Sequence, residues 1–163
     1  MSERMLNTKD NIRHVSIIKK TASRICATQV LYGTSFVETD IDFLIKSYTE
    51  NYLPSILIEL GISQIDNDLL ISITNGVFEN RLSIDEIISE HLSEKWSFNR
   101  LSETEKSVLR LATYELCFVK RFNKITIINE YISIIESFGG NPNFANGILE
   151  KISQFKLNYM PYE

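Results

Sequence analysis

Side chains that could build a metal or catalytic site are few and far apart in this sequence. Its two histidines, His14 and His91, and its two cysteines, Cys26 and Cys117, show no His-x-x-x-His or Cys-x-x-Cys spacing, the arrangements that gather metal ligands. Neither histidine stands in a recognisable setting for activating a serine. The six glycines form no Gly-x-Gly-x-x-Gly or phosphate-loop pattern. We therefore expect no metal, no cofactor and no catalytic step, but a protein that binds other molecules.

Basic side chains are the second group that could do chemistry, and they gather near the N-terminus. The 163-residue chain has a net charge of −4, yet residues 1–32 hold six basic and two acidic residues, which makes this segment +4 and leaves −8 for the rest. A basic segment on an acidic protein favours an anionic partner, with nucleic acid as the first candidate. The alternative is a solvated basic helix end, and charge alone does not choose between the two.

Helices must position these side chains, because apolar residues recur at helical spacing and no convincing period-two alternation occurs. We predict an all-α fold of about seven helices, arranged as two helical bundles that share one core. Residues 1–12 are expected to be disordered, residues 13–158 to form a single domain, and the aromatic tail from Tyr159 to fray or lie on the surface. The expected helices cover about 14–34, 40–60 with a break at Pro54, 65–81, a segment from Ser83, 103–121, 126–138 and a segment after Asn141-Pro142.

Local signals predict where several of these helices begin and end. Thr39 or Asp40 is the expected cap of the second helix, and Ser-x-x-Glu capping boxes are expected at Ser83 and Ser102. Gly139-Gly140 predicts the end of the sixth helix, since a left-handed C-cap favours glycine.

The first predicted helix carries most of the basic residues. With a start near residue 14, Lys20 and Arg24 share one face, opposite an inward apolar stripe. Arg13 joins that face if the helix begins one or two turns earlier, because steps of seven and eleven residues return to nearly the same angle.

Cysteine usage and hydropathy indicate the compartment. Cys26 and Cys117 fall in amphipathic helices and are expected to be buried free thiols, which fits a reducing cytosol. No uninterrupted apolar run resembles a signal peptide or reaches the roughly 20 residues that a bilayer requires. The expected location is cytoplasmic, without a membrane partner.

Several motifs in the second half of the chain occur together in one known family. They are Trp96-x-x-x-Arg100-Leu101, Glu105-Lys106, Leu109-Arg110-Leu111-Ala112-x-Tyr114-Glu115-Leu116, Ile128-Asn129-Glu130, Phe138-Gly139 and Phe144-Ala145-Asn146-Gly147-Ile148-Leu149. Upstream lie Arg24-x-x-Ala27-x-Gln29-x-Leu31-Tyr32 and Gly76-Val77. With these motifs the chain resembles the NusB family of bacterial transcription antitermination factors, over residues 19–153 and weakly between 36 and 68.

This resemblance implies a fold of two perpendicular bundles, each of three to four helices, without cofactor or catalytic step. It also implies binding of the single-stranded boxA element of nascent RNA together with NusE, a ribosomal small-subunit protein, and assembly into the RNA polymerase antitermination complex. Unpaired RNA is generally recognised by cations on phosphates and aromatic rings on bases.

The same resemblance assigns residues to the RNA. Lys20 and Arg24 would contact phosphates, and Tyr32 and Phe144 would lie near the RNA, with packing as the alternative for both rings. Arg110 is a further candidate, for which an intramolecular ion pair is the alternative.

Two residues of the fifth predicted helix are assigned to the protein partner. Glu105 and Lys106 would lie on the NusE-facing surface, and Glu105 could serve the helix cap as well. Trp96 is interpreted as an anchor between helices and not as a site.

The chain departs from the family pattern at two places. Its first helix has fewer basic residues at the start, Lys19-Lys20-Thr21-Ala22-Ser23-Arg24, which predicts weaker RNA binding. The loop over 139–143 is about two residues shorter than usual, which puts the NusE contact in question more than the fold.

Two other functions remain open at this point. One is a protein-interaction scaffold that has kept the fold and lost RNA affinity. The other is a stand-alone relative of the RNA-binding domain that precedes certain RNA cytosine methyltransferases. A homodimer formed through the first helix, which would hide its cations, is a further hypothesis.

Overall fold

The computed structural model of this chain describes residues 2–155, with side chains from residue 11 onward. The tail from Tyr159 and the expected domain end at 158 lie outside the described residues. Over 2–155 the secondary structure consists of eight α-helices, one 3-10 helix and one π-helix, with no strand. The all-α prediction is confirmed. The chain divides into two compact units, residues 1–72 and 73–163, in line with the two bundles expected.

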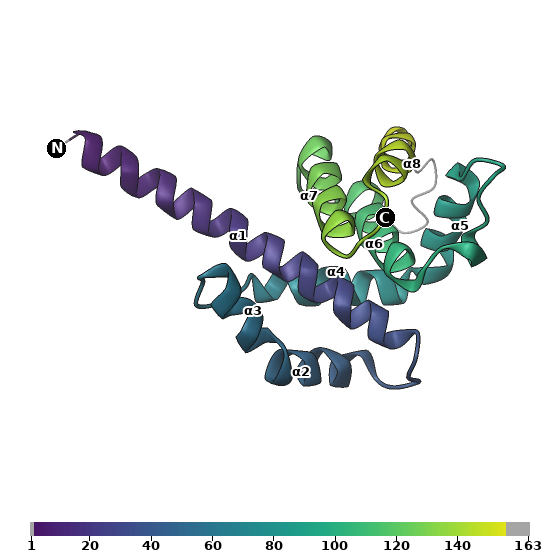
Figure 1. Cartoon of the computed structure of the whole chain (residues 1–163), viewed down its shortest axis with the longest axis horizontal. Helices are drawn as coiled ribbons and strands as arrows, with labels where there is room; N and C mark the ends of the chain where they lie inside the picture. The colour runs from purple at the N-terminus through teal and green to yellow at the C-terminus, as the bar shows by residue number, and fades with distance from the viewer. Residues whose placement is uncertain (1, 156–163) are drawn as a thin grey trace, which may run out of the picture. The chain divides into compact units, whose positions relative to one another are not determined.

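The first unit is built on one long helix. It contains α1 (Ser2–Thr34), α2 (Ile41–Asn51) and α3 (Leu53–Leu60), and α4 (Asn67–Glu79) begins in it and continues into the second unit. α1 packs against both α2 and α3, and its first turns extend past them (Figure 1). Ala22 and Cys26 of α1 are fully buried, as Ile45 and Tyr48 of α2 nearly are.

α1 starts within the segment 1–12, whose disorder stays a prediction. The helix is continuous from Ser2, in a segment that holds neither proline nor glycine before Gly33. Nothing in its local sequence therefore breaks the helix before residue 34.

The predicted break at Pro54 is confirmed. α2 ends at Asn51 and α3 begins at Leu53, with Pro54 in the first turn of α3, where its missing N–H leaves no helical bond unmade. Asp40 is the cap of α2, its side chain accepting a hydrogen bond from the Asp42 amide. Because the break makes two helices of one predicted segment, the described chain has eight α-helices where about seven were expected.

The second unit surrounds one buried helix. It contains α5 (Arg81–His91), η1 (Phe98–Arg100), α6 (Glu103–Tyr114), η2 (Glu115–Val119), α7 (Lys124–Ser137) and α8 (Pro142–Gln154). Every residue from 107 to 113 of α6 is buried, and α6 packs against α5, α7 and α8 (Figure 1).

One predicted cap is wrong and two boundaries are confirmed. The helix expected to open at Ser83 begins at Arg81 instead, after Asn80, and has no side-chain cap; Ser83 therefore lies within its first turn. Ser102 and Glu105 form the complete capping box that was predicted. Gly139 has φ of +82°, as the expected glycine C-cap requires.

The helix expected over 103–121 changes its winding at residue 115. Residues Glu115–Val119 form a π-helix, η2, in which each turn takes up one more residue than an α-turn. η2 contains the buried Glu115, whose carboxylate accepts a hydrogen bond from the Tyr131 hydroxyl of α7.

Gly76 lets two helices of the second unit approach closely. A Cβ at this position would overlap the ring and hydroxyl of Tyr114. Gly147 of α8 also lies in a helix, but a Cβ there would meet nothing within 4 Å.

We expect Gly76→Ala to lower the free energy of unfolding by about 1–3 kcal/mol, because the added methyl displaces the Tyr114 ring. The matched control Gly147→Ala should leave stability unchanged or raise it by up to about 1 kcal/mol, since alanine favours a helix. Urea denaturation measures both. Equal stability of the two variants would contradict the close approach.

The two thiols are buried, as predicted. Cys26 is 0% exposed and Cys117 2% exposed, and burial raises the pKa of each thiol to about 11. A hydrogen bond with Tyr48 opposes the shift at Cys26, and Lys120 and Lys124 oppose it at Cys117.

We expect both thiols to resist a thiol-reactive dye in the folded protein at pH 8 and to react at once in urea. The raised pKa also sets a sign for stability. Between pH 9, the ordinary thiol value, and about 11, the unfolded thiols ionise while the folded ones stay protonated, so the free energy of unfolding falls as pH rises. Fast labelling of either cysteine in the native protein would refute the burial of that thiol.

Candidate nucleic-acid interface

The basic residues of α1 lie in line but differ in exposure. Because α1 begins well before residue 13, Arg13 falls on the same face as Lys20 and Arg24. Arg13 is exposed and Lys20 is half-buried, with its ammonium donating to Ser16 Oγ at 2.8 Å. Arg24 is only 2% exposed, and its side chain interacts with other residues of the chain. Among the side chains that the structure describes, the cations offered to solvent on this face are therefore Arg13 and Lys20.

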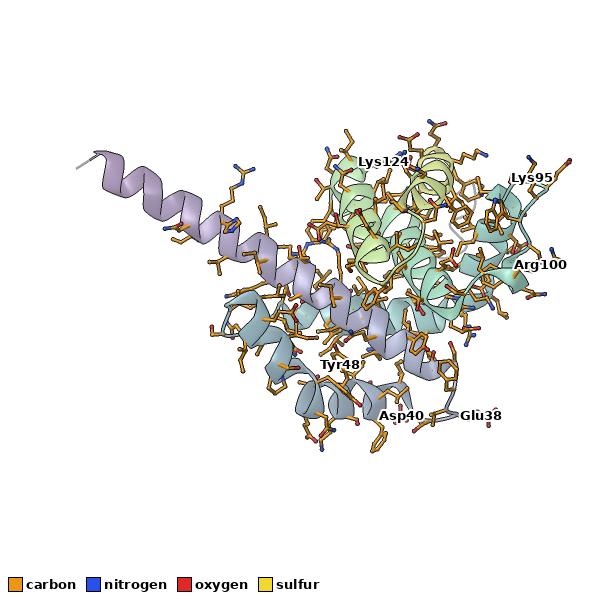
Figure 2. The ribbon with its side chains drawn as sticks, in the orientation of Figure 1. Glu38, Asp40, Tyr48, Lys95, Arg100 and Lys124 are labelled. Atoms are coloured by element: carbon orange, nitrogen blue, oxygen red, sulfur yellow. The ribbon has the colours of Figure 1, made fainter. Side chains whose placement is uncertain are left out.

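Tyr32 is exposed at the C-terminal end of α1. Its ring lies 4.9 Å from that of Phe36, with 57° between the planes. It borders a hollow of about 340 Å³ in the first unit, lined by Gln29, Val30, Tyr32, Gly33, Leu44, Ser47, Tyr48 and Tyr52. Glu38 and Asp40, on the turn between α1 and α2, lie near this end of α1 (Figure 2).

Tyr48 is the most deeply buried ring that lines that hollow. It points from α2 toward α1 (Figure 2), with its ring stacked on Tyr52 at 5.5 Å. Its hydroxyl is buried without a nitrogen or oxygen partner among the described residues and lies beside the Cys26 thiol, a weak acceptor. Burial raises the pKa of this hydroxyl, which therefore stays neutral.

Phe144 lies in the second unit, in the first turn of α8, and is half-buried. Its ring contacts Trp96 at a centroid distance of 4.8 Å. Trp96 belongs to the segment between α5 and α6 that Lys95 and Arg100 mark in Figure 2. It contacts α8 as an anchor would, yet it is 46% exposed.

Arg110 is buried in an ion pair, the alternative that sequence reasoning had left open. Its Nε and Nη2 donate to the two carboxylate oxygens of Asp85 at 2.7 and 3.0 Å, and its guanidinium lies over the Phe98 ring at 5.4 Å. The residue itself is 5% exposed. Such a two-bond geometry holds the guanidinium in one position, between α5 and α6.

Glu105 and Lys106 lie at the start of α6. Glu105 accepts from the Ser102 amide at 3.2 Å and donates its own amide to Ser102 Oγ at 3.1 Å. Lys106 pairs with Glu103 at 3.2 Å and lies over the Phe98 ring. Both residues are half-buried, so each offers part of its side chain to a partner.

The predicted site residues fall into two groups. Lys20, Arg24 and Tyr32 belong to the first unit, and Phe144, Arg110, Glu105 and Lys106 to the second. Sequence reasoning missed Asp85, whose carboxylate fixes Arg110, since no spacing joins residues 25 positions apart. It also missed the exposure of Trp96, which no spacing in the sequence reveals.

The described part of the chain lacks both a metal-binding cluster and a membrane-spanning helix. No group of three or more His, Cys, Asp or Glu side chains there could hold a metal ion. No helix in that part is long and apolar enough to cross a membrane.

The comparisons with known proteins agree on one family. The sequence model of the NusB family matches residues 21–154. The transcription antitermination protein NusB of Clostridium novyi is 28% identical over 134 residues, 81% of this chain and 96% of the relative. That of Sulfurimonas denitrificans is 39% identical over 103 residues, 62% of this chain and 76% of the relative.

Solved structures agree with the fold. NusB of T. maritima has a TM-score of 0.67 and 32% identity, covering 84% of this chain and 92% of that one. A crystal structure of the antitermination factors NusB and NusE in complex with dsRNA also has a TM-score of 0.67, at 23% identity, covering 83% of this chain and 96% of that one. This second likeness concerns the fold alone.

We expect Asp85→Asn to lower the free energy of unfolding by about 2–3 kcal/mol, because it leaves the buried Arg110 without its counter-charge. Glu103→Gln, which removes the half-buried single-contact pair with Lys106, should cost less than about 1 kcal/mol. Urea denaturation compares the two. A small effect of Asp85→Asn would mean that Arg110 does not depend on this pair.

Proposed function

Because this chain belongs to the NusB family, we propose that it is a transcription antitermination adaptor that binds boxA-like single-stranded RNA together with the ribosomal protein NusE. The observation that carries the proposal is the family match over residues 21–154, which spans helices of both units. The relatives compared above share the name transcription antitermination protein. The adaptor has no catalytic step of its own and works in the cytoplasm, within the antitermination complex of RNA polymerase.

The exposed residues among the candidates supply the RNA contacts in this proposal. Lys20 offers a cation for a phosphate, and Tyr32, which is 43% exposed, offers a ring for a base. Phe144 supplies a second ring on the other unit. Arg24 and Arg110 are assigned to the fold, because burial keeps their guanidinium groups away from a phosphate.

The NusE contact is assigned to the start of α6. Glu105 and Lys106 lie side by side there, one acidic and one basic, on a helix start that the capping box keeps in place. A surface that carries both charges favours a partner with the complementary arrangement of charges, and this complementarity helps to select that partner.

A second candidate is supported by one observation. Two of the five predicted RNA-binding residues, Arg24 and Arg110, are buried cations. Fewer exposed cations weaken RNA affinity, so a scaffold that binds protein partners alone is the alternative to test. No observation favours a relative of the methyltransferase domain.

The test measures fluorescence anisotropy of a labelled boxA-like RNA, with and without NusE, against a scrambled RNA. We expect tighter binding of the boxA-like RNA when NusE is present. Lys20→Ala should weaken it and lower the slope of log affinity against log salt by about 0.7, the value for one phosphate of a single strand. Lys46→Ala, on the exposed face of α2 in the same unit, is the control and should bind as the native protein does. Absence of RNA binding even with NusE would leave the scaffold.

A further inference from the structure

Two aromatic rings of the second unit lie together at the surface. Trp96 and Phe144 are in contact at 4.8 Å with 38° between their planes, and Trp96 keeps 46% of its surface exposed. A tryptophan that served only to join helices would bury most of its large apolar surface. The exposed part of this ring is therefore available to a ligand.

The rings border a small hollow between α5 and the start of α8. Its volume is about 190 Å³, and it is lined by His91, Leu92, Ser93, Trp96, Asn143, Phe144, Gly147, Ile148 and Lys151. Sites for drug-sized molecules usually enclose about 300–1,000 Å³. This hollow is too small for such a molecule but has room for one planar ring.

The polar groups around the hollow favour an anionic ligand. Lys151 is exposed and supplies a positive charge, and none of the described lining residues is acidic. α8 begins at Pro142, so the positive end of its dipole lies next to the rings. Asn143 adds an amide side chain that can both donate and accept hydrogen bonds.

We propose that Trp96 and Phe144 form a stacking site for one unpaired RNA base, with the adjoining phosphate next to Lys151 and the base edge facing Asn143. The proposal rests on the RNA-binding function proposed above and adds Trp96, Asn143 and Lys151 to it. A flat ring of a base fits the hollow and its aromatic wall, and the phosphate fits the cation, so that one nucleotide satisfies both features.

Trp96 is the chain's one tryptophan, so its own fluorescence reports the site. The native protein is titrated with a short single-stranded boxA-like RNA, and tryptophan emission and the anisotropy of the labelled RNA are read together. We expect the emission to be quenched with the same midpoint as the anisotropy change. Trp96→Ala should weaken binding about five- to hundredfold, the range for loss of one base–aromatic stack.

Matched variants separate stacking from general damage. Phe78→Ala removes a ring that is 48% exposed on α4 and lies outside the hollow, and it should bind RNA as the native protein does. Lys151→Ala should lower the salt slope by about 0.7, while Phe144→Leu should weaken both binding and quenching. Thermal unfolding of each variant verifies that the fold is retained.

Three results would overturn the stacking site. RNA that binds by anisotropy without quenching Trp96, and equally well to Trp96→Ala, would leave the adaptor function and remove this site from it. Emission that responds to NusE alone and not to RNA would make the occupant a protein side chain. No anisotropy change with any RNA would refute the RNA-binding function and this site together.

Discussion

The second unit depends on one constraint, which is that α6 has no solvated side between residues 107 and 113. Seven successive residues, 107–113, are buried, and a polar group in such a helix must find its partner inside the protein. Arg110 does so with Asp85 of α5, and Ser107 donates to the Glu103 carbonyl at 2.8 Å. The hydroxyl of Thr113 is the exception, buried without a partner among the described residues. α5 is therefore held to α6 by a directed polar contact as well as by apolar packing.

The need of a buried charge for a partner inside the protein also divides the cations of the chain between two roles. A guanidinium buried with its own partner stabilises the fold, while one in solvent can meet a phosphate, and the same side chain does not serve both at once. With Arg24 and Arg110 buried and a net charge of −4, this protein has little general attraction for RNA. In the proposed function, its affinity for RNA therefore rests on a few placed contacts and on rings, which act at short range and depend less on salt.

The sequence predicted the helices far better than the exposure of their side chains. Asp40, Pro54, Ser102 and Gly139 act through local geometry, so their effects on helix ends could be predicted from neighbouring residues alone. The burial of Arg24 and the pairing of Arg110 with Asp85 depend on residues distant in sequence, which periodicity does not reveal. The same reason explains why Trp96 was interpreted only as an anchor between helices. A contact of its ring with another helix was predicted, but the exposure of part of that ring was not. The capping-box motif at Ser83 predicted the wrong helix start, because α5 begins earlier, at Arg81.

The π-helix at the end of α6 has a consequence for the length of the chain. η2 winds one residue more into its turn than an α-helix does and is followed by Lys120, whose φ of 52° is left-handed. The extra residue is absorbed within a single turn, while Glu115, the first residue of η2, keeps its contact with Tyr131 of α7. Evolution could therefore add or delete one residue here without shifting α7 along its axis. Single-residue gaps in alignments of homologous chains should collect at this turn, as marks of winding and not of a change in function.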